Sequence, residues 1–118
     1  MAAGINQAVT EALAFGAAMN LPMDRVIEAV GSGAVGNWFL DHRGASMVAG
    51  RYTPGFRLAL HHKDLRICRD MARALGVSLP VVEMTLLHYQ RLIDAGHGDE
   101  DISALYRSKR QLFRKEAK

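Results

Sequence analysis

The residue types best suited to chemistry gather in one stretch near the middle of the chain, residues 54–65. If a helix begins near Phe56, then Phe56, Leu60 and Lys63 share one face of it, because side chains at this spacing lie above one another. Asp64 lies beside them. An aromatic ring, an ammonium group and a carboxylate presented together suit the edge of a cofactor or substrate cleft. The alternative is a solvated helix face with one isolated aromatic residue.

A metal site is a weaker interpretation of the same stretch. His61, Asp64 and Cys68 stand at positions i, i+3 and i+7, so one helix could present three metal ligands. Cys68, however, falls on the apolar stripe of the predicted helix, and no second ligand cluster occurs in the sequence. We therefore expect no metal site.

Two other features are expected to carry no chemistry. The glycine-rich segment 31–36 follows a predicted helix and lacks the Lys-Ser/Thr ending of a phosphate-binding loop, so it is expected to be a linker. His42, His88 and His97 have no recognisable partner in the sequence and are expected at the surface or at helix caps.

Helices must position these residues, because apolar residues recur at helical spacing along nearly the whole chain. Glycine and proline punctuate them. The predicted helices run from Ala2 to Asn20, from Pro22 to Gly31, from Asn37 to about Val48, from about Arg57 to Leu75, from Pro80 to His97, and onward from a cap at Asp99 or Asp101.

The apolar stripes of these helices predict the core. In the helix near residues 57–75 the stripe comprises Leu58, Leu65, Cys68, Ala72 and Leu75. In the last helix the residues expected to face inward are Ile102, Leu105, Leu112 and Phe113. Alternating apolar and polar residues are never sustained, so no strand is expected. The sequence predicts an all-α, multi-helix bundle with residues 1–118 as a single domain.

Composition narrows the classes of function. The chain has 118 residues, of which 49% are hydrophobic, enough for one core. No apolar run reaches membrane-spanning length, and the single Cys68 suits a reducing, cytoplasmic location. Cations crowd the end of the chain, where only Glu116 opposes them: Arg107, Lys109, Arg110, Arg114, Lys115 and Lys118. A solvated terminal helix explains this tail better than nucleic-acid binding, so neither a nucleic acid nor a membrane is an expected partner.

Several segments together resemble the C-terminal helical domain of the β-hydroxyacid dehydrogenase family, of the 3-hydroxyisobutyrate or tartronate semialdehyde type. Residues 4–16 resemble its "AG…AEAL…G" helix, residues 21–30 its "GLD…VLEAI" helix, and residues 36–50 its "G-S-W…P-x-M…G" segment. Phe56 and Lys63-Asp64-Leu65 match "F…KDL", the most specific motif, and residues 98–105 match "G…DxSAL". The resemblance follows the family's order along nearly the whole chain.

The resemblance implies a fold and a function. Members of this family join an N-terminal Rossmann domain, which binds NAD or NADP, to a helical domain like that of 6-phosphogluconate dehydrogenase-like enzymes. That helical domain closes the active site and builds the dimer. The resemblance implies that Phe56 and Lys63 lie beside the nicotinamide and that Asp64 supports Lys63. The expected substrate is a small hydroxyacid, and the chain is expected to form a homo-oligomer through its helices.

Parts of the family pattern are missing from this sequence. The family's catalytic lysine belongs one to two turns before Gly4, which places it upstream of Met1, and the dinucleotide-binding motif lies in the absent Rossmann domain. No catalytic residue is therefore assigned here, and the isolated chain is expected to be inactive. Asn37 stands where a serine is commoner in the family. The choice of hydroxyacid and of NAD or NADP rests on that other domain. A non-catalytic helical dimerisation module is the alternative interpretation.

Overall fold

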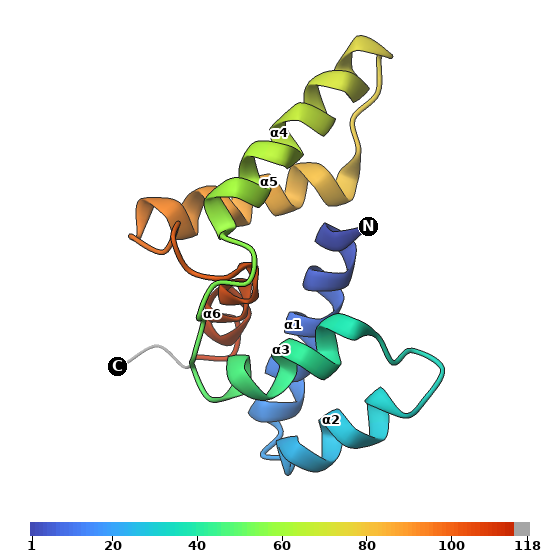
Figure 1. The fold of residues 1–118 in the computed structure, drawn as a ribbon, viewed down its shortest axis with the longest axis vertical. Helices are drawn as coiled ribbons and strands as arrows, with labels where there is room; N and C mark the ends of the chain where they lie inside the picture. Colours follow the sequence, from blue (N-terminus) through green and yellow to red (C-terminus); the bar gives the residue numbers. More distant parts are fainter. Residues whose placement is uncertain (115–118) are drawn as a thin grey trace.

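Helices make up almost all of the structure, a computed structural model that describes residues 1–114 (Figure 1). They are α1 (Ala2–Ala18), α2 (Met23–Gly31), α3 (Trp38–Val48), α4 (Leu58–Ala74), α5 (Pro80–Asp94), the 3₁₀ helix η1 (Ile102–Ala104) and α6 (Leu105–Gln111). Within the described range the only β-type pairing is an isolated bridge between Arg57 and Asp101. The predicted all-α class is therefore confirmed.

The helix boundaries follow local signals in the sequence. The side chain of Asn37 accepts a hydrogen bond from the backbone N–H of Leu40 at 2.9 Å and so caps α3. After α4, Gly76 adopts a φ of +76°, a left-handed conformation that costs glycine little and ends the helix. Pro80 opens α5, where a missing backbone N–H costs nothing.

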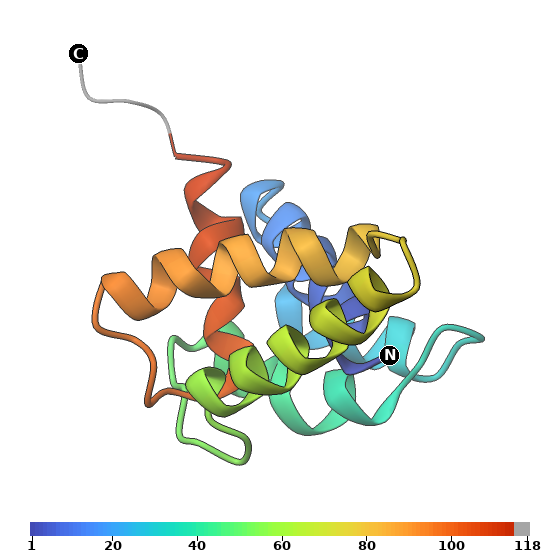
Figure 2. The ribbon, with the colours of Figure 1, turned by 90° about the horizontal axis from the view of Figure 1, so that it is seen from above.

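The helices form a body and a hairpin. α4 and α5 pack against each other as a hairpin whose far end projects, while α5 also packs against α1 and α6, and α1 packs against α2, α3 and α6 (Figures 1 and 2). The first turn of α1 also reaches α5, because a Cβ added at Gly4 would lie 3.9 Å from Val81. The fully buried side chains at the centre of the core include Leu40, Met47, Leu58, Leu105, Tyr89 and Tyr106.

Polar side chains on α1 also face the core. The buried Asn6 donates from Nδ2 to the Tyr89 hydroxyl at 2.7 Å and to the Ile102 carbonyl at 2.9 Å. Gln7 Nε2 donates to Thr85 Oγ1 at 3.0 Å. These bonds join α1 to α5 and η1, and they satisfy polar groups that would be costly to bury alone.

Several predicted core positions were wrong. Cys68 is exposed because α4 packs mainly on α5 and buries only a narrow strip, and Leu75 is 82% exposed at the tip of the hairpin. Leu112 and Phe113 lie beyond the end of α6 and are exposed, although the Phe113 ring stacks on Phe15 with centroids 6.2 Å apart. The stripe itself is confirmed at Leu58, Leu65 and Ala72.

The sequence predicts no membrane-spanning segment and a basic tail at the end of the chain. None of the helices within residues 1–114 combines the length and apolar character that crossing a membrane requires. Of the predicted basic tail, Lys115, Glu116 and Lys118 lie outside the described residues.

Candidate functional site

An apolar pocket of about 330 Å³ opens where segments from both ends of the chain meet. The first turn of α1, the first two turns of α3, the segment before α4 and the start of η1 form its walls. Its lining residues are Ala2, Ile5, Asn37, Trp38, Phe39, Arg43, Gly55, Phe56, Asp101 and Ile102. A concave, mostly apolar pocket with a few polar groups is the usual form of a small-molecule site.

The carboxylate of Asp101 holds Phe56 in this pocket. Its Oδ1 accepts hydrogen bonds from the backbone N–H groups of Gly55 and Phe56, each at 3.0 Å. The Phe56 carbonyl in turn accepts from the Ile102 N–H at 2.9 Å. Oδ2 of Asp101 accepts from the Ser103 N–H at 2.9 Å and thereby caps η1. One side chain thus holds the segment before α4 against the start of η1, although the two are distant in the sequence.

These hydrogen bonds of Asp101, called here the Asp101 clamp, depend on an ionised carboxylate. Burial opposes ionisation of Asp101, but the hydrogen bonds from the backbone of Phe56, Ser103 and Gly55 outweigh it and lower its pKa below the ordinary value. Arg43 Nε lies 3.6 Å from Asp101 Oδ2. A Cβ added at Gly55 would overlap the Arg43 guanidinium, so a larger residue there would displace this flexible side chain from its present position.

Trp38 forms an exposed aromatic rim to the pocket. Its side chain is 61% exposed and stacks on His42, one turn along α3, with ring centroids 4.0 Å apart. The Arg43 guanidinium carbon lies 5.3 Å from the Trp38 ring centroid, a cation–π distance. The rim therefore offers a flat apolar surface next to a positive charge.

A buried histidine connects the pocket to the core. His61 packs its ring against Phe56, with centroids 5.1 Å apart, and its Nδ1 lies 2.9 Å from the Tyr89 hydroxyl. The Tyr89 hydroxyl already accepts from Asn6, so it donates to His61. Burial lowers the pKa of His61, which keeps the ring neutral and suited to accept this bond.

The predicted face of Phe56, Lys63 and Asp64 does not form as one helix face. The helix begins at Leu58 rather than near Phe56, because the bonds to Asp101 and Ile102 hold Phe56 in the preceding extended segment. Phe56 lines the pocket, half-buried, whereas Lys63 and Asp64 are exposed on α4 and do not line it. Their predicted contact with a cofactor stays a prediction.

Met1, upstream of which the family's catalytic lysine is predicted, is not itself part of the pocket. Its side chain is fully exposed and lies outside the set of lining residues, although Ala2 next to it belongs to that set. The Met1 carbonyl accepts a hydrogen bond from the Ile5 N–H at 3.0 Å, so the helical bonding of α1 begins at this residue. The position of the lysine before Met1 stays a prediction.

Sequence reasoning missed Trp38, Arg43 and Asp101 as members of this site. A signal existed for Asp101, which is the aspartate of the "DxSAL" segment, but nothing in the sequence indicates that it reaches the residues around Phe56. Arg43 carries no such signal, since one arginine on a polar helix face is unremarkable in a sequence.

The ligand set considered for a metal is not brought together. His61 is buried and faces the core, while Asp64 and Cys68 are both exposed on α4. Over residues 1–114, His, Cys, Asp and Glu side chains nowhere form a group of three or more that could hold a metal ion.

Comparison with known proteins identifies relatives of the whole helical unit. Residues 1–108 match the family model described as "NAD-binding of NADP-dependent 3-hydroxyisobutyrate dehydrogenase". L-threonate dehydrogenase of Escherichia coli K12 is 34% identical over 104 residues, which are 87% of this chain and 34% of that protein. 2-Hydroxy-3-oxopropionate reductase of the same strain is 36% identical over 74 residues, 63% of this chain and 25% of that protein.

Solved structures show the same arrangement of helices. A 3-hydroxyisobutyrate dehydrogenase from Salmonella typhimurium superposes with a TM-score of 0.81 at 33% identity, over 90% of this chain and 38% of that one. A 3-hydroxyisobutyrate dehydrogenase from Mycobacterium tuberculosis superposes with a TM-score of 0.75 at 24% identity, over 92% of this chain and 39% of that one, and shares the fold. This chain spans about a third of the length of its relatives. It belongs to the 3-hydroxyisobutyrate dehydrogenase-like family of NAD(P)-dependent hydroxyacid dehydrogenases.

Proposed function

We propose that this chain is the cleft-closing helical domain of an NAD(P)-dependent hydroxyacid dehydrogenase. The observation that carries the proposal is that the first turn of α1, Trp38 and Phe56 line one pocket. The resemblance implies a proton-donating lysine one to two turns before Gly4. Chain preceding Met1 and continuing the helix of α1 would approach the same end of the domain, so the pocket lies where reacting groups are expected.

The lining residues fit a nicotinamide ring or a small hydroxyacid. Ile5, Trp38 and Phe56 supply flat apolar walls, and the pocket volume is at the lower end of the range for small-molecule sites. The guanidinium of Arg43 has five N–H donors, of which Asp101 and the His42 carbonyl engage a part, so others can meet a substrate carboxylate. Closure over the pocket would exclude water from the reacting groups.

When bound, the oxidised nicotinamide would accept the hydride that leaves the carbinol carbon of the hydroxyacid, and the reduced nicotinamide would return it in the reverse direction. Lys63 and Asp64 stand exposed on α4, where they can meet groups presented by a dinucleotide-binding domain. We assign Lys63 to the cofactor, as a point charge for its carboxamide or phosphate oxygens, and Asp64 to the support of Lys63.

A chimera tests this proposal. The chain replaces the matching segment of E. coli L-threonate dehydrogenase, and reduction of NAD⁺ and NADP⁺ is followed with a panel of small hydroxyacids. The unaltered chimera should turn over one of these acids. Lys63→Ala should lower kcat/KM by at least about tenfold, because a hydrogen bond to a charged group is typically worth about 1.5–3 kcal/mol.

The matched control is Arg66→Ala, which removes another exposed cation of α4. It should leave kcat/KM within about twofold. Equal kinetics for the Lys63→Ala chimera and its parent would remove Lys63 from the site. A folded chimera, with native helix content by circular dichroism, that reduces neither nucleotide with any of the acids would contradict the proposed function.

A non-catalytic dimerisation module is the second candidate, and the exposed apolar face of the α4–α5 hairpin favours it. This hairpin face comprises Ile67, Met71, Leu75, Val77 and Leu79, each at least 41% exposed. Contiguous apolar surface of this kind marks association sites. The two candidates are compatible, since one domain can close a cleft and also join two subunits.

A further inference from the structure

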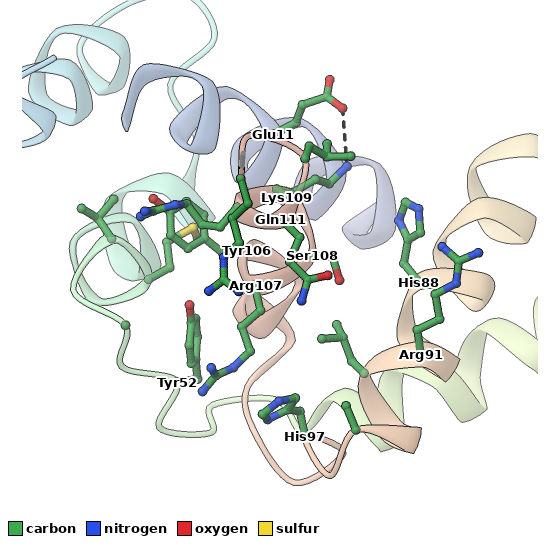
Figure 3. Close-up of a pocket in the computed structure, with 18 of the residues that line it drawn as sticks. Glu11, Tyr52, His88, Arg91, His97, Tyr106, Arg107, Ser108, Lys109 and Gln111 are labelled. Carbon is green, nitrogen blue, oxygen red and sulfur yellow. Dashed lines mark ion pairs between the residues drawn. The ribbon is translucent and has the colours of Figure 1, made fainter. Parts of the chain in front are cut away.

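We propose a second binding site, for a small phosphate-bearing anion, in the basic pocket beside α6. This pocket has a volume of about 760 Å³ and lies between α6, α5 and the segment that follows α3 (Figure 3). Among the described residues, it shares no lining residue with the pocket of Phe56. This basic pocket is therefore separate from the site proposed for the dehydrogenase function.

The pocket carries a large excess of positive charge. Its cationic lining residues are Arg91, Arg107, Lys109, Arg110 and Arg114, joined by His88 and His97. Within residues 1–114, Glu11 is the only acidic residue that lines it. Figure 3 shows His88 and Arg91 on α5 facing Lys109 on α6 across the opening. A cleft lined by one sign of charge concentrates ions of the opposite sign.

Acids within the chain neutralise only part of this charge. Lys109 is 4% exposed, donates to Gln7 Oε1 at 2.5 Å and lies 3.5 Å from Glu11. Arg107 forms a two-pronged ion pair with Glu100, at 2.9 and 2.8 Å, and His97 Nδ1 lies 2.9 Å from the same carboxylate. These contacts fix the inner wall of the pocket.

Two other arginines have no acidic partner within 4.0 Å among residues 1–114. Arg91 on α5 and Arg110 on α6 line the pocket without an ion pair in that range, and Arg110 lies over the Tyr106 ring, 5.8 Å from its centroid. After burial, the charges of Lys109 and Arg91 are the next largest causes of the lowered pKa of His88, consistent with a positive field at this wall. Arginine forks match the geometry of phosphate oxygens, so these two residues suit such a ligand.

The shape and the aromatic residues favour a small anion over a nucleic acid. Surfaces that bind single-stranded nucleic acid stack bases on exposed aromatic rings. Here the Tyr106 side chain is 2% exposed, and the Arg107 guanidinium carbon lies 4.6 Å over the Tyr52 ring. The volume lies within the range of small-molecule sites. A multiply charged phosphate compound, such as one that carries a pyrophosphate group, is the class expected to bind.

Calorimetric titration with inorganic pyrophosphate at about 0.15 M NaCl tests the proposal, with citrate as a carboxylate anion of similar charge. Pyrophosphate should bind saturably with one site per chain, and citrate at least about tenfold more weakly. Arg91→Gln combined with Arg110→Gln should weaken pyrophosphate binding by at least about tenfold. The matched control, Arg25→Gln with Arg66→Gln, removes two exposed arginines from α2 and α4 and should change the Kd less than about twofold.

Three results would overturn the site: no saturable binding, equal weakening by the control pair, or binding of citrate as tight as that of pyrophosphate. Displacement of pyrophosphate by a short DNA duplex that binds more tightly would assign the surface to nucleic acid instead. Helix content by circular dichroism shows that each variant is folded, so lost binding reports the pocket.

Discussion

At the scale of single residues, Asp101 connects two segments that are distant in the sequence. One carboxylate accepts from three backbone N–H groups, on Gly55, Phe56 and Ser103, and lies beside Arg43. The arrangement uses the fact that ionised acceptors make stronger hydrogen bonds than neutral ones. The position of Phe56 is thus decided by a residue far from it in the sequence.

Replacement of this carboxylate should be costly. Asp101→Ala leaves three N–H groups without their acceptor, and we expect the free energy of unfolding to fall by about 3 kcal/mol. Urea unfolding followed by circular dichroism measures it. Asp99→Ala, whose carboxylate is exposed, serves as the control and should cost less than about 0.5 kcal/mol. A loss for Asp101→Ala no greater than for Asp99→Ala would show that the clamp contributes nothing to stability.

The buried His61 predicts how stability depends on pH. Its folded-state pKa is lowered, first by burial, so between the folded value and about 6.5 the unfolded chain binds a proton that the folded chain does not. Stability should therefore be highest above about pH 7 and fall as the pH drops below about 6.5, by at most ~1.4 kcal/mol per pH unit from this group.

Urea unfolding between about pH 5 and pH 8 checks this dependence. His61→Asn should flatten the curve even though it destabilises the chain overall, whereas His42→Asn, which changes an exposed histidine of α3, should keep the parent's slope. His62 and His88 also have lowered pKa values and contribute in the same direction, so some slope should persist. An unchanged slope in His61→Asn would contradict the assignment.

At the scale of helices, apolar spacing predicted which segments are helical better than which side chains are buried. The predicted helices beginning near Ala2, Asn37 and Pro80 are all present. Apolar spacing fails to predict burial where a helix extends beyond its packing partner, as at Leu75. It also fails where a polar residue such as Asn6 is buried, because hydrogen-bond partners on other helices satisfy its side chain. The residues around Leu75 and Asn6 in the sequence show neither where the neighbouring helix ends nor which distant group will bind a polar side chain.

The α4–α5 hairpin leads to a prediction about association. Met71 and Leu75 are 66% and 82% exposed at its projecting end. If this face joins two subunits, Met71→Lys with Leu75→Lys should shift sedimentation from dimer towards monomer and raise the dimer Kd by at least about tenfold, since it places charge in an apolar interface.

The matched control is Val35→Lys, which alters an exposed apolar residue in the α2–α3 connection, outside the hairpin. It should leave the sedimentation profile unchanged. A parent chain that stays monomeric at all concentrations would contradict the proposed association, as would a dimer that the hairpin variant leaves intact.

At the scale of the whole molecule, the fold brings segments that match separate family motifs into contact with one another. In the sequence, the segments around Phe56 and Asp101 are separate similarities, yet the fold joins them through hydrogen bonds of 2.9–3.0 Å. Identification of the family was possible from the motifs, but the pocket was not, because Trp38, Arg43 and Ile5 reach it from other helices. The role of Phe56 beside a nicotinamide, which the resemblance implies, stays a prediction, whereas its predicted place on the helix was wrong because α4 begins at Leu58.

The Phe56 pocket draws its walls from residues as early as Ala2 and as late as Ile102. Dissection of the chain into smaller pieces should therefore destroy it before any single helix is lost. A protease cut in the exposed connection at Arg51 would leave α1 to α3 on one fragment and Phe56 with Asp101 on the other. Ligand recognition would then survive only for as long as the two fragments stay associated.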